Sequence, residues 1–319
     1  MGRQQQSRAP GESRAPGRAR WACLALLWAS CAGVGERTGH GAAPDAVRIP
    51  FTLTAADNLS IRATVNGTDS VELMFHTAVD SVSMTKEAIA RLSRFTADES
   101  VEVQSWGGTT QARHSAGNTL AIGDQVWRDV AITEDDNSGP GTDGKFGPGL
   151  FAGKVVEIDF DARQLVIHST LPAIEPRFER LDLVRREGLL FVTGELGVGE
   201  GRYATEFLLH TGFGGTALLD EQFLRMHGLD DELETISESV LRDSYGNPVK
   251  TRKVRLASLR LGALTFSDVP VGLFEGWLGS QRVSVLGGGL LKRCNLIIDA
   301  ENRHLYVAPS RLKDAPFES

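Results

Sequence analysis

The sequence predicts an all-β protein that is built from two homologous lobes and contains few, short helices. Its apolar and β-branched runs are short and end at Gly or Asn turns, which is typical of strands in barrels and sandwiches. Residues 85–92 and 220–226 begin with a capping residue followed by Glu in the first turn, so each is expected to form a short helix. A chain of 319 residues is also long enough for two domains.

An internal repeat is the evidence for two homologous lobes. Residues 146–167 align with 286–307, so that Gly147 matches Gly287 and Asp159 matches Asp299. Three matched pairs of segments occur in the same order, and the other two are Glu72-Leu-Met-Phe-His-Thr-Ala78 with Glu206-Phe-Leu-Leu-His-Thr-Gly212, and Ser105-Trp-Gly107 with Ser244-Tyr-Gly246. Repeats of this kind decide the architecture. They predict an N-terminal lobe at 47–172 and a C-terminal lobe at 178–312, joined through the proline-containing connector 171–177.

The N-terminus predicts an exported protein. Residues 1–32 combine an Arg-rich start with an apolar run that ends in small side chains, which is typical of a signal peptide and too short for a membrane span. Residues 33–46 are rich in Gly and Ala and predict a flexible tether. Cys31 is an alternative lipidation site, although Trp28 stands where a lipobox prefers Leu. We therefore expect a secreted, periplasmic or cell-envelope protein, with membrane attachment only through a lipid anchor.

The charge limits which binding partners are expected, and the cysteine content limits which disulfides can form. The formal net charge is −7, and because residues 1–32 contribute +4 (five Arg and one Glu), the remainder carries −11. A body this acidic repels phosphate backbones, which excludes nucleic acid as an expected partner. The mean hydropathy of −0.15 argues against a membrane bundle. Of the three cysteines, only Cys294 lies outside the apolar start, so the mature chain has no intramolecular disulfide and Cys294 is expected to be an apolar filler.

The ordered set of motifs in each half resembles a lobe of the pepsin and retropepsin aspartic proteases. The set is an apolar strand ending in X-Thr-Gly or X-Thr-Ala, an aromatic-Gly hairpin tip, a Gly-x-Gly-Leu stretch and an Ile-Asp strand, and it covers most of 47–312. The resemblance implies two β-barrel lobes related by a pseudo-twofold axis. In that family X is Asp in both lobes, and the two carboxylates share one proton and activate the attacking water.

Both X positions are His in this chain. His76 precedes Thr77-Ala78, and His210 precedes Thr211-Gly212. Two imidazoles offer one usable nitrogen each and are mostly neutral near pH 7, so the ordinary acid-protease mechanism is not expected. We therefore interpret His76 and His210 as a degenerate catalytic pair.

The resemblance extends to the loops and hairpins that surround the substrate cleft in that family. The resemblance implies that the hydroxyls of Thr77 and Thr211 lock the two loops together, that Ala78 stands in the first loop, and that Gly212 keeps the tight turn of the second. It also places Trp106-Gly107 and Tyr245-Gly246 at the tips of two flap hairpins, whose strands can pair with an extended peptide. The sequence therefore predicts a protein that binds an extended peptide or protein segment without acid proteolysis.

Two other functions remain open. One is a hydrolase that uses His76, His210 and Asp80 in altered chemistry, and the other is a structural envelope protein with a filled cleft. No cofactor is expected. Two neutral imidazoles are half of a zinc shell, but a third ligand is not evident, and Asp80 and His114 are candidates by sequence proximity alone. A pH switch is a further alternative, because protonating both histidines would repel the lobes. The oligomeric state is not predicted.

Two further motifs are interpreted as structural. Asp159 and Asp299 end apolar strands and are expected to form turns. The Gly-x-Gly stretches at 147–149 and 287–289 lack the third Gly and the helix of a nucleotide-binding loop.

Overall fold

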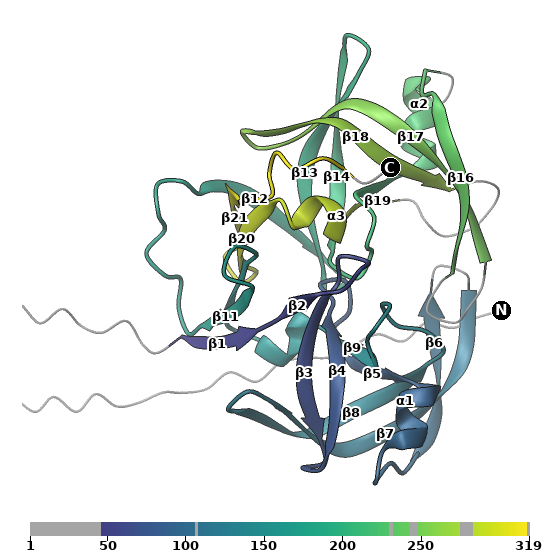
Figure 1. Ribbon diagram of the computed structural model, residues 1–319, viewed down its shortest axis with the longest axis vertical. Helices are drawn as coiled ribbons and strands as arrows, with labels where there is room; N and C mark the ends of the chain where they lie inside the picture. Colours follow the sequence, from purple (N-terminus) through teal and green to yellow (C-terminus); the bar gives the residue numbers. More distant parts are fainter. Residues whose placement is uncertain (1–45, 106–107, 230–231, 243–247, 275–282, 318–319) are drawn as a thin grey trace, which may run out of the picture. The chain divides into compact units, whose positions relative to one another are not determined.

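The computed structural model describes residues 46–105, 108–229, 232–242, 248–274 and 283–317 (Figure 1). The predicted signal peptide and tether, except for residue 46, lie outside these ranges, as do Cys31 and the four flap-tip residues Trp106, Gly107, Tyr245 and Gly246. No helix within the described ranges is long and apolar enough to cross a membrane.

The N-terminal lobe is a sheet with two short helical segments. Its elements are β2 (Thr52–Leu53), β3 (Leu59–Val65), β4 (Asp69–Phe75), β5 (Val82–Thr85), α1 (Lys86–Arg91), β6 (Glu99–Ser105), β7 (Gly108–Ile122), β8 (Gln125–Asp135), β9 (Gly144–Phe146) and the 3-10 helix η1 (Pro148–Phe151). The strand order is β2-β3-β4-β9-β5-β8-β7-β6, and an additional pairing of β3 with β7 closes the lobe.

The C-terminal lobe repeats this plan. Its elements are β13 (Leu189–Val198), β14 (Gly201–His210), β15 (Ala217–Leu219), α2 (Glu221–His227), β16 (Thr235–Arg242), β17 (Pro248–Leu261), β18 (Leu264–Phe274), β19 (Ser284–Gly287) and α3 (Gly288–Leu291). The order is β13-β14-β19-β15-β18-β17-β16, with an additional pairing of β13 with β17. The protein is therefore all-β with two barrel lobes, as the sequence predicted.

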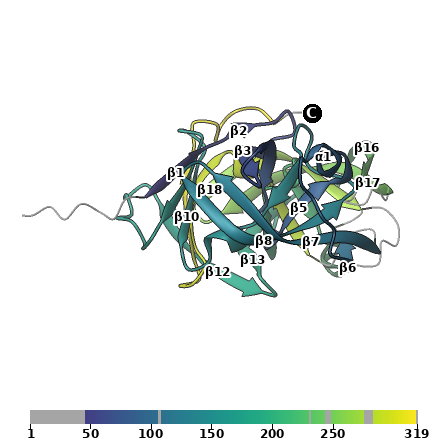
Figure 2. The same ribbon diagram turned by 90° about the horizontal axis from the view of Figure 1, so that it is seen from below.

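Six further strands extend the second sheet and come from both halves of the chain. They are β1 (Val47–Pro50), β10 (Val155–Asp159), β11 (Gln164–His168), β12 (Glu179–Arg186), β20 (Cys294–Asp299) and β21 (His304–Pro309). Their order is β1-β11-β10-β20-β21-β12, and β10 pairs with β20 antiparallel. The two repeated Ile-Asp strands therefore lie side by side. Figure 2 shows β1, one end of this sheet, on the left and β16, its other end, on the right.

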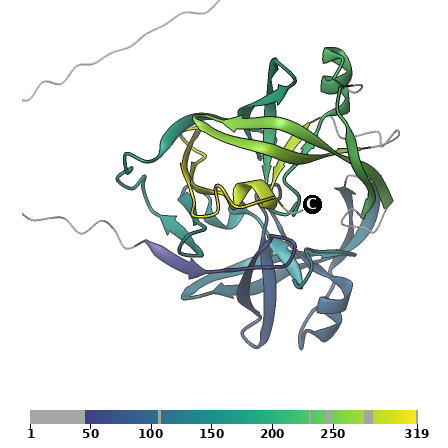
Figure 3. The ribbon, with the colours of Figure 1, turned by 45° about the horizontal axis from the view of Figure 1, so that its top comes forward.

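The two predicted helices form where their caps predict them. The Thr85 hydroxyl accepts a hydrogen bond from the Ala88 amide at the start of α1, and the Asp220 carboxylate accepts one from the Gln222 amide at the start of α2. Helix α2 ends at Gly228 in the left-handed conformation, with φ of 66°. Both helices lie on the outer sides of their lobes (Figure 3).

In each lobe, a pair of parallel strands holds the strand end at which one of the two repeated histidines lies. In the N-terminal lobe β4 pairs with β9, with Phe75 opposite Phe146. In the C-terminal lobe β14 pairs with β19, with Leu209 opposite Leu286. These four side chains are almost fully buried in one apolar core. The residue after Phe75 and the residue after Leu209 are therefore held on rigid strand ends.

Candidate functional site

The two histidines meet between the lobes. His76 follows β4, and His210 is the last residue of β14. Their ring centroids are 4.5 Å apart, with an angle of 48° between the ring planes, and each residue is only 7% exposed. The internal repeat thus brings two residues that are distant in the sequence to one buried site.

A reciprocal network of hydrogen bonds from two threonines holds the two histidine-containing loops together. The Thr77 hydroxyl donates to the Leu209 carbonyl (2.7 Å) and accepts from the Thr211 amide (3.1 Å). The Thr211 hydroxyl donates to the Phe75 carbonyl (2.7 Å) and accepts from the Thr77 amide (3.0 Å). Each hydroxyl therefore satisfies one donor and one acceptor of the buried main chain, which is costly to leave unpaired. Thr77 and Thr211 lie where the sequence expected a loop lock.

Gly212 and Asn58 also contribute to the packing of the two histidine-containing loops. Gly212 leaves room for His76, because a Cβ atom at position 212 would lie 2.2 Å from His76 Cδ2. Asn58, at the turn between β2 and β3, donates from its side chain to the Thr211 carbonyl (3.1 Å) and is buried. The sequence analysis missed Asn58, since nothing in its local pattern distinguishes it from a turn residue.

The hydrogen bonding of His76 fixes its tautomer. The Ala78 amide donates to His76 Nδ1 over 3.1 Å. A neutral imidazole that accepts at Nδ1 carries its proton on Nε2. Ala78 therefore supports the site through its main chain, and His76 presents an N–H donor from its other nitrogen.

Both histidines are neutral at physiological pH. Burial lowers the pKa of His76 well below its usual value, and the nearby His210 and Lys145 lower it further. Burial also lowers the pKa of His210 to about 4, with a further contribution from the Lys145 charge. Desolvation favours the neutral form of an imidazole, and a neighbouring cation acts in the same direction.

Lys145 is the charged residue that the sequence analysis missed. It lies on β9, almost fully buried, and its ammonium lies 2.9 Å from a carboxylate oxygen of Asp135. The Ser83 hydroxyl donates to the same carboxylate oxygen. The repeat could have identified this residue, because Lys145 corresponds to Val285 in the second lobe. A Lys at the position of an apolar strand residue is expected to be buried only if it has a charged partner.

The other candidate residues lie apart from the histidine pair. Asp80 is exposed and lines a cavity beside Gly188 whose lining contains neither histidine. His114 lies on β7, where its Nδ1 is 3.0 Å from the Thr133 hydroxyl. In the ranges that the structure covers, no group of three or more His, Cys, Asp or Glu side chains is placed to hold a metal ion. The site thus presents two neutral imidazoles and no carboxylate pair.

The residues interpreted as structural behave as expected. The Asp159 carboxylate accepts from the Ala162 amide (2.8 Å), and the Asp299 carboxylate accepts from the Asn302 amide (3.2 Å), so both close turns at strand ends. Cys294 is fully buried, and burial raises the pKa of its thiol to about 12. An inert, buried thiol of this kind is a packing residue.

Comparisons with known proteins agree with this architecture. Residues 61–147 match the family described as aspartyl protease, a range that contains His76 and most strands of the N-terminal lobe. The structure is similar to the crystal structure of the aspartic proteinase from Irpex lacteus, with a TM-score of 0.60 and 12% sequence identity over 86% of this chain and 100% of that one. A search of curated proteins by sequence found no match. The chain therefore has the two-lobed fold of pepsin-like and retropepsin-like aspartic proteases.

Proposed function

We propose that this chain is an exported, aspartic-protease-like protein that binds an extended peptide between its lobes without acid proteolysis. In this proposal His76 and His210 stand at the positions of the catalytic Asp pair. The observation that carries it is the contact between the two imidazole rings at the ends of β4 and β14, inside the intact threonine network.

The absence of acid proteolysis follows from the protonation of the pair. A carboxylate dyad works because it holds one shared proton, so that one group accepts a proton from water while the other donates one. His76 is bound at Nδ1 by the Ala78 amide and offers only an N–H donor at Nε2. His210, with its pKa at about 4, gains a second proton only in acid. The neutral rings share no proton, and once His210 is protonated in acid both of its nitrogens are donors, so neither ring can accept a proton from the attacking water.

Peptide binding is supported by the two long hairpins. Strand β6 is the last strand of its sheet and pairs with β7 from Glu99 to Ser105. Strand β16 is the last strand of the other sheet and pairs with β17 from Thr235 to Arg242. The free edge of such a strand can hydrogen-bond an extended chain by strand addition. Export is proposed from the Arg-rich and apolar N-terminus.

Cleavage and binding of peptides test the proposal separately. A library of fluorescein-labelled octapeptides is incubated with the full-length protein between pH 3 and pH 8, with and without pepstatin, and cleavage is followed by mass spectrometry. We expect no cleavage, and we expect binding by fluorescence anisotropy. Cleavage that disappears in His76→Ala would overturn the proposal in favour of a histidine-dependent hydrolase. Absence of binding to any peptide would also overturn it.

Replacing both histidines by Asp tests whether their positions are those of a catalytic pair. We expect the double variant His76→Asp/His210→Asp to gain pepstatin-sensitive cleavage below pH 5, because two carboxylates at this distance share one proton. Each single variant is the matched control and should stay inactive. A double variant that folds, binds peptide and remains inactive would contradict the assignment of these positions.

A further inference from the structure

The N–H group at Nε2 of His76 is a buried donor that no described residue satisfies. The Ala78 amide donates to Nδ1 over 3.1 Å, which places the proton of the neutral ring on Nε2. Within the described residues Nε2 makes no hydrogen bond, although His76 is only 7% exposed. A buried donor without an acceptor is unfavourable. A ligand that brings an acceptor to this nitrogen therefore gains from completing the bond.

The space beside this donor is open to a ligand. In the described part of the chain, the fully enclosed atoms that lack a hydrogen bond do not include His76 Nε2, so this nitrogen retains contact with solvent. Its ring edge faces Gly212, where a Cβ atom would lie 2.3 Å from Nε2. Any other residue at position 212 would therefore occupy the space next to the donor, and glycine leaves it free.

The surroundings of the donor favour an uncharged acceptor. Burial lowers the pKa of both His76 and His210, so this site disfavours charge. The nearby Lys145 ammonium already has the Asp135 carboxylate as its ion partner, over 2.9 Å. A carboxylate of a ligand would have to give up its hydration for contact with two neutral rings. A carbonyl oxygen loses less hydration and accepts the same hydrogen bond.

An extended peptide carries carbonyl groups at regular intervals. Each residue has one main-chain carbonyl, and successive residues of an extended chain lie about 3.3 Å apart. His76 follows β4 of the N-terminal lobe and His210 ends β14 of the C-terminal lobe, and their rings are in contact where the lobes meet. A peptide bound between the lobes can therefore present a carbonyl to His76 whatever its side chains are.

We infer that His76 Nε2–H donates a hydrogen bond to one main-chain carbonyl oxygen of the bound peptide, while His210 packs beside it as a neutral ring. The inference rests on the proposed function and names the group of the ligand that the histidine pair recognises. It makes His76 a binding residue whose contact is independent of the side chains of the peptide.

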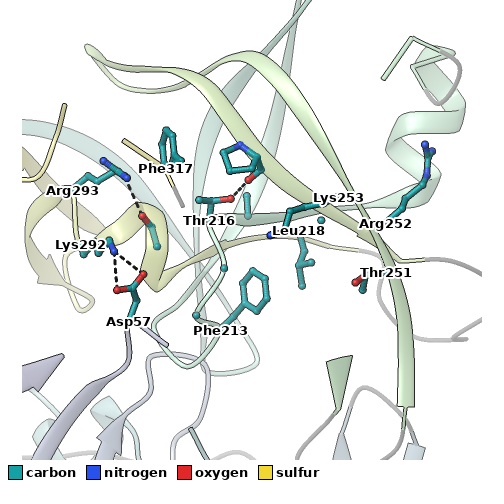
Figure 4. A pocket seen from close by; sticks show the side chains of 16 residues that line it. Asp57, Phe213, Thr216, Leu218, Thr251, Arg252, Lys253, Lys292, Arg293 and Phe317 are labelled. Carbon is teal, nitrogen blue, oxygen red and sulfur yellow. Dashed lines mark hydrogen bonds and ion pairs between the residues drawn. The ribbon is translucent and has the colours of Figure 1, made fainter. Parts of the chain in front are cut away.

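A separate cavity provides a control for binding outside the pair. This cavity has a volume of about 350 Å³, lies beside the loop that follows His210, and is lined by neither histidine (Figure 4). Loop residues 213–218 form one wall, and Lys253 of β17 also lines it. A substitution of Lys253 therefore changes this cavity and leaves the donor of His76 in place.

The test uses the full-length protein and a fluorescein-labelled octapeptide that binds it. One amide bond of the peptide at a time is replaced by a trans alkene, which keeps the extended shape and removes both the carbonyl oxygen and the N–H. An ester at the same bond removes only the N–H. We expect a position at which the alkene weakens binding about tenfold in fluorescence anisotropy, whereas the ester weakens it much less.

Variants of His76 identify the carbonyl that it contacts. In His76→Leu the unmodified peptide should bind about tenfold more weakly, and the alkene at that position should cause no further loss. His76→Gln places an amide N–H close to the position of Nε2 and should retain part of the loss. His227→Leu and Lys253→Met are the matched controls and should behave as wild type, because His227 is exposed on α2 and Lys253 lines the separate cavity.

The outcomes separate this inference from the proposed function. An alkene effect that His76→Leu leaves unchanged at every position would overturn the inference and leave peptide binding intact. So would an effect that disappears in Lys253→Met, which would place the carbonyl in the separate cavity. Absence of binding to every peptide would overturn both.

Two further measurements complete the test. A peptide that ends at this position with a free carboxylate, or carries Glu there, should bind no more tightly than its amide or Gln counterpart, and tighter binding would overturn the uncharged acceptor. Thermal melting shows whether each variant is folded. His76→Asn keeps an acceptor for the Ala78 amide but is too short to place a donor at Nε2, and it replaces His76→Leu if that variant does not fold.

Discussion

The Thr77 and Thr211 hydroxyls each donate to a main-chain carbonyl within the last two residues of a strand of the opposite lobe, and each accepts a hydrogen bond from the amide of the other threonine. Leu209 and Phe75 supply the two carbonyl oxygens, both at 2.7 Å from the donating hydroxyl. All four hydrogen bonds are buried. The lobes are therefore joined at the candidate site by a closed network, and the position of the histidine rings depends on it.

Removing one hydroxyl should destabilise the protein. Thr77→Val leaves the Thr211 amide and the Leu209 carbonyl without their partner, and we expect a loss of about 1–3 kcal/mol in the free energy of unfolding by urea. The double variant with Thr211→Val should lose less than the two single losses combined, because both belong to one network. Thr77→Ser retains the hydroxyl and should stay near wild type, as should Thr109→Val at an exposed position. Additive losses would contradict the closed network.

Gly212→Ala should displace the His76 ring. The new Cβ atom would lie 2.2 Å from His76 Cδ2, so the ring or the loop must move. We expect a loss of about 1–3 kcal/mol in the free energy of unfolding, typical of overpacking. His76→Ala in the same chain removes the clash and should restore most of the loss. A Gly212→Ala protein as stable as wild type would show that the two groups do not pack as described.

Stability should fall as the pH drops from about 6.5 to about 4. His210 has its pKa lowered to about 4 in the folded state, whereas an unfolded His titrates near 6.5. The unfolded chain therefore binds the proton first, and stability that is fully present above pH 6.5 is lost as the pH falls toward 4. His210 alone accounts for about 3 kcal/mol of this loss, and His76, whose pKa is also lowered, adds to it. Urea unfolding at intervals between pH 7 and pH 4 measures this. In His76→Gln/His210→Gln the fall should be much smaller, and an equal fall would assign it to other groups.

Lys145 should act on the histidines through its charge. In Lys145→Met/Asp135→Asn, which removes both members of the buried ion pair, we expect the pKa of His210 to rise above 4. It should stay below 6.5, because burial is the larger cause of its depression and is retained. Titration followed by NMR of the imidazole carbons measures the shift. Lys145→Arg keeps the charge and should leave the pKa close to that of the wild type, and a pKa unchanged in the double variant would rule out the electrostatic role.

The sequence by itself determined the repeated strand pattern, the two capped helices and the positions of His76 and His210 in matching motifs. These features depend on local periodicity, on capping residues and on a duplication, and all of them are visible along the chain. The structure adds that the two strand ends come together, with the rings 4.5 Å apart.

Only the tertiary structure decided the environment of the pair. Burial between the lobes lowers the pKa of both imidazoles. The bond from Asn58 to Thr211 joins residues that are far apart in the sequence, and the ion pair of Lys145 with Asp135 joins β9 to the end of β8. The cavity beside the loop that follows His210 likewise collects residues from six separate segments of the chain. Desolvation and Coulomb interactions depend on distance in space, so the repeat can mark Lys145 as unusual but does not report which groups lie near it.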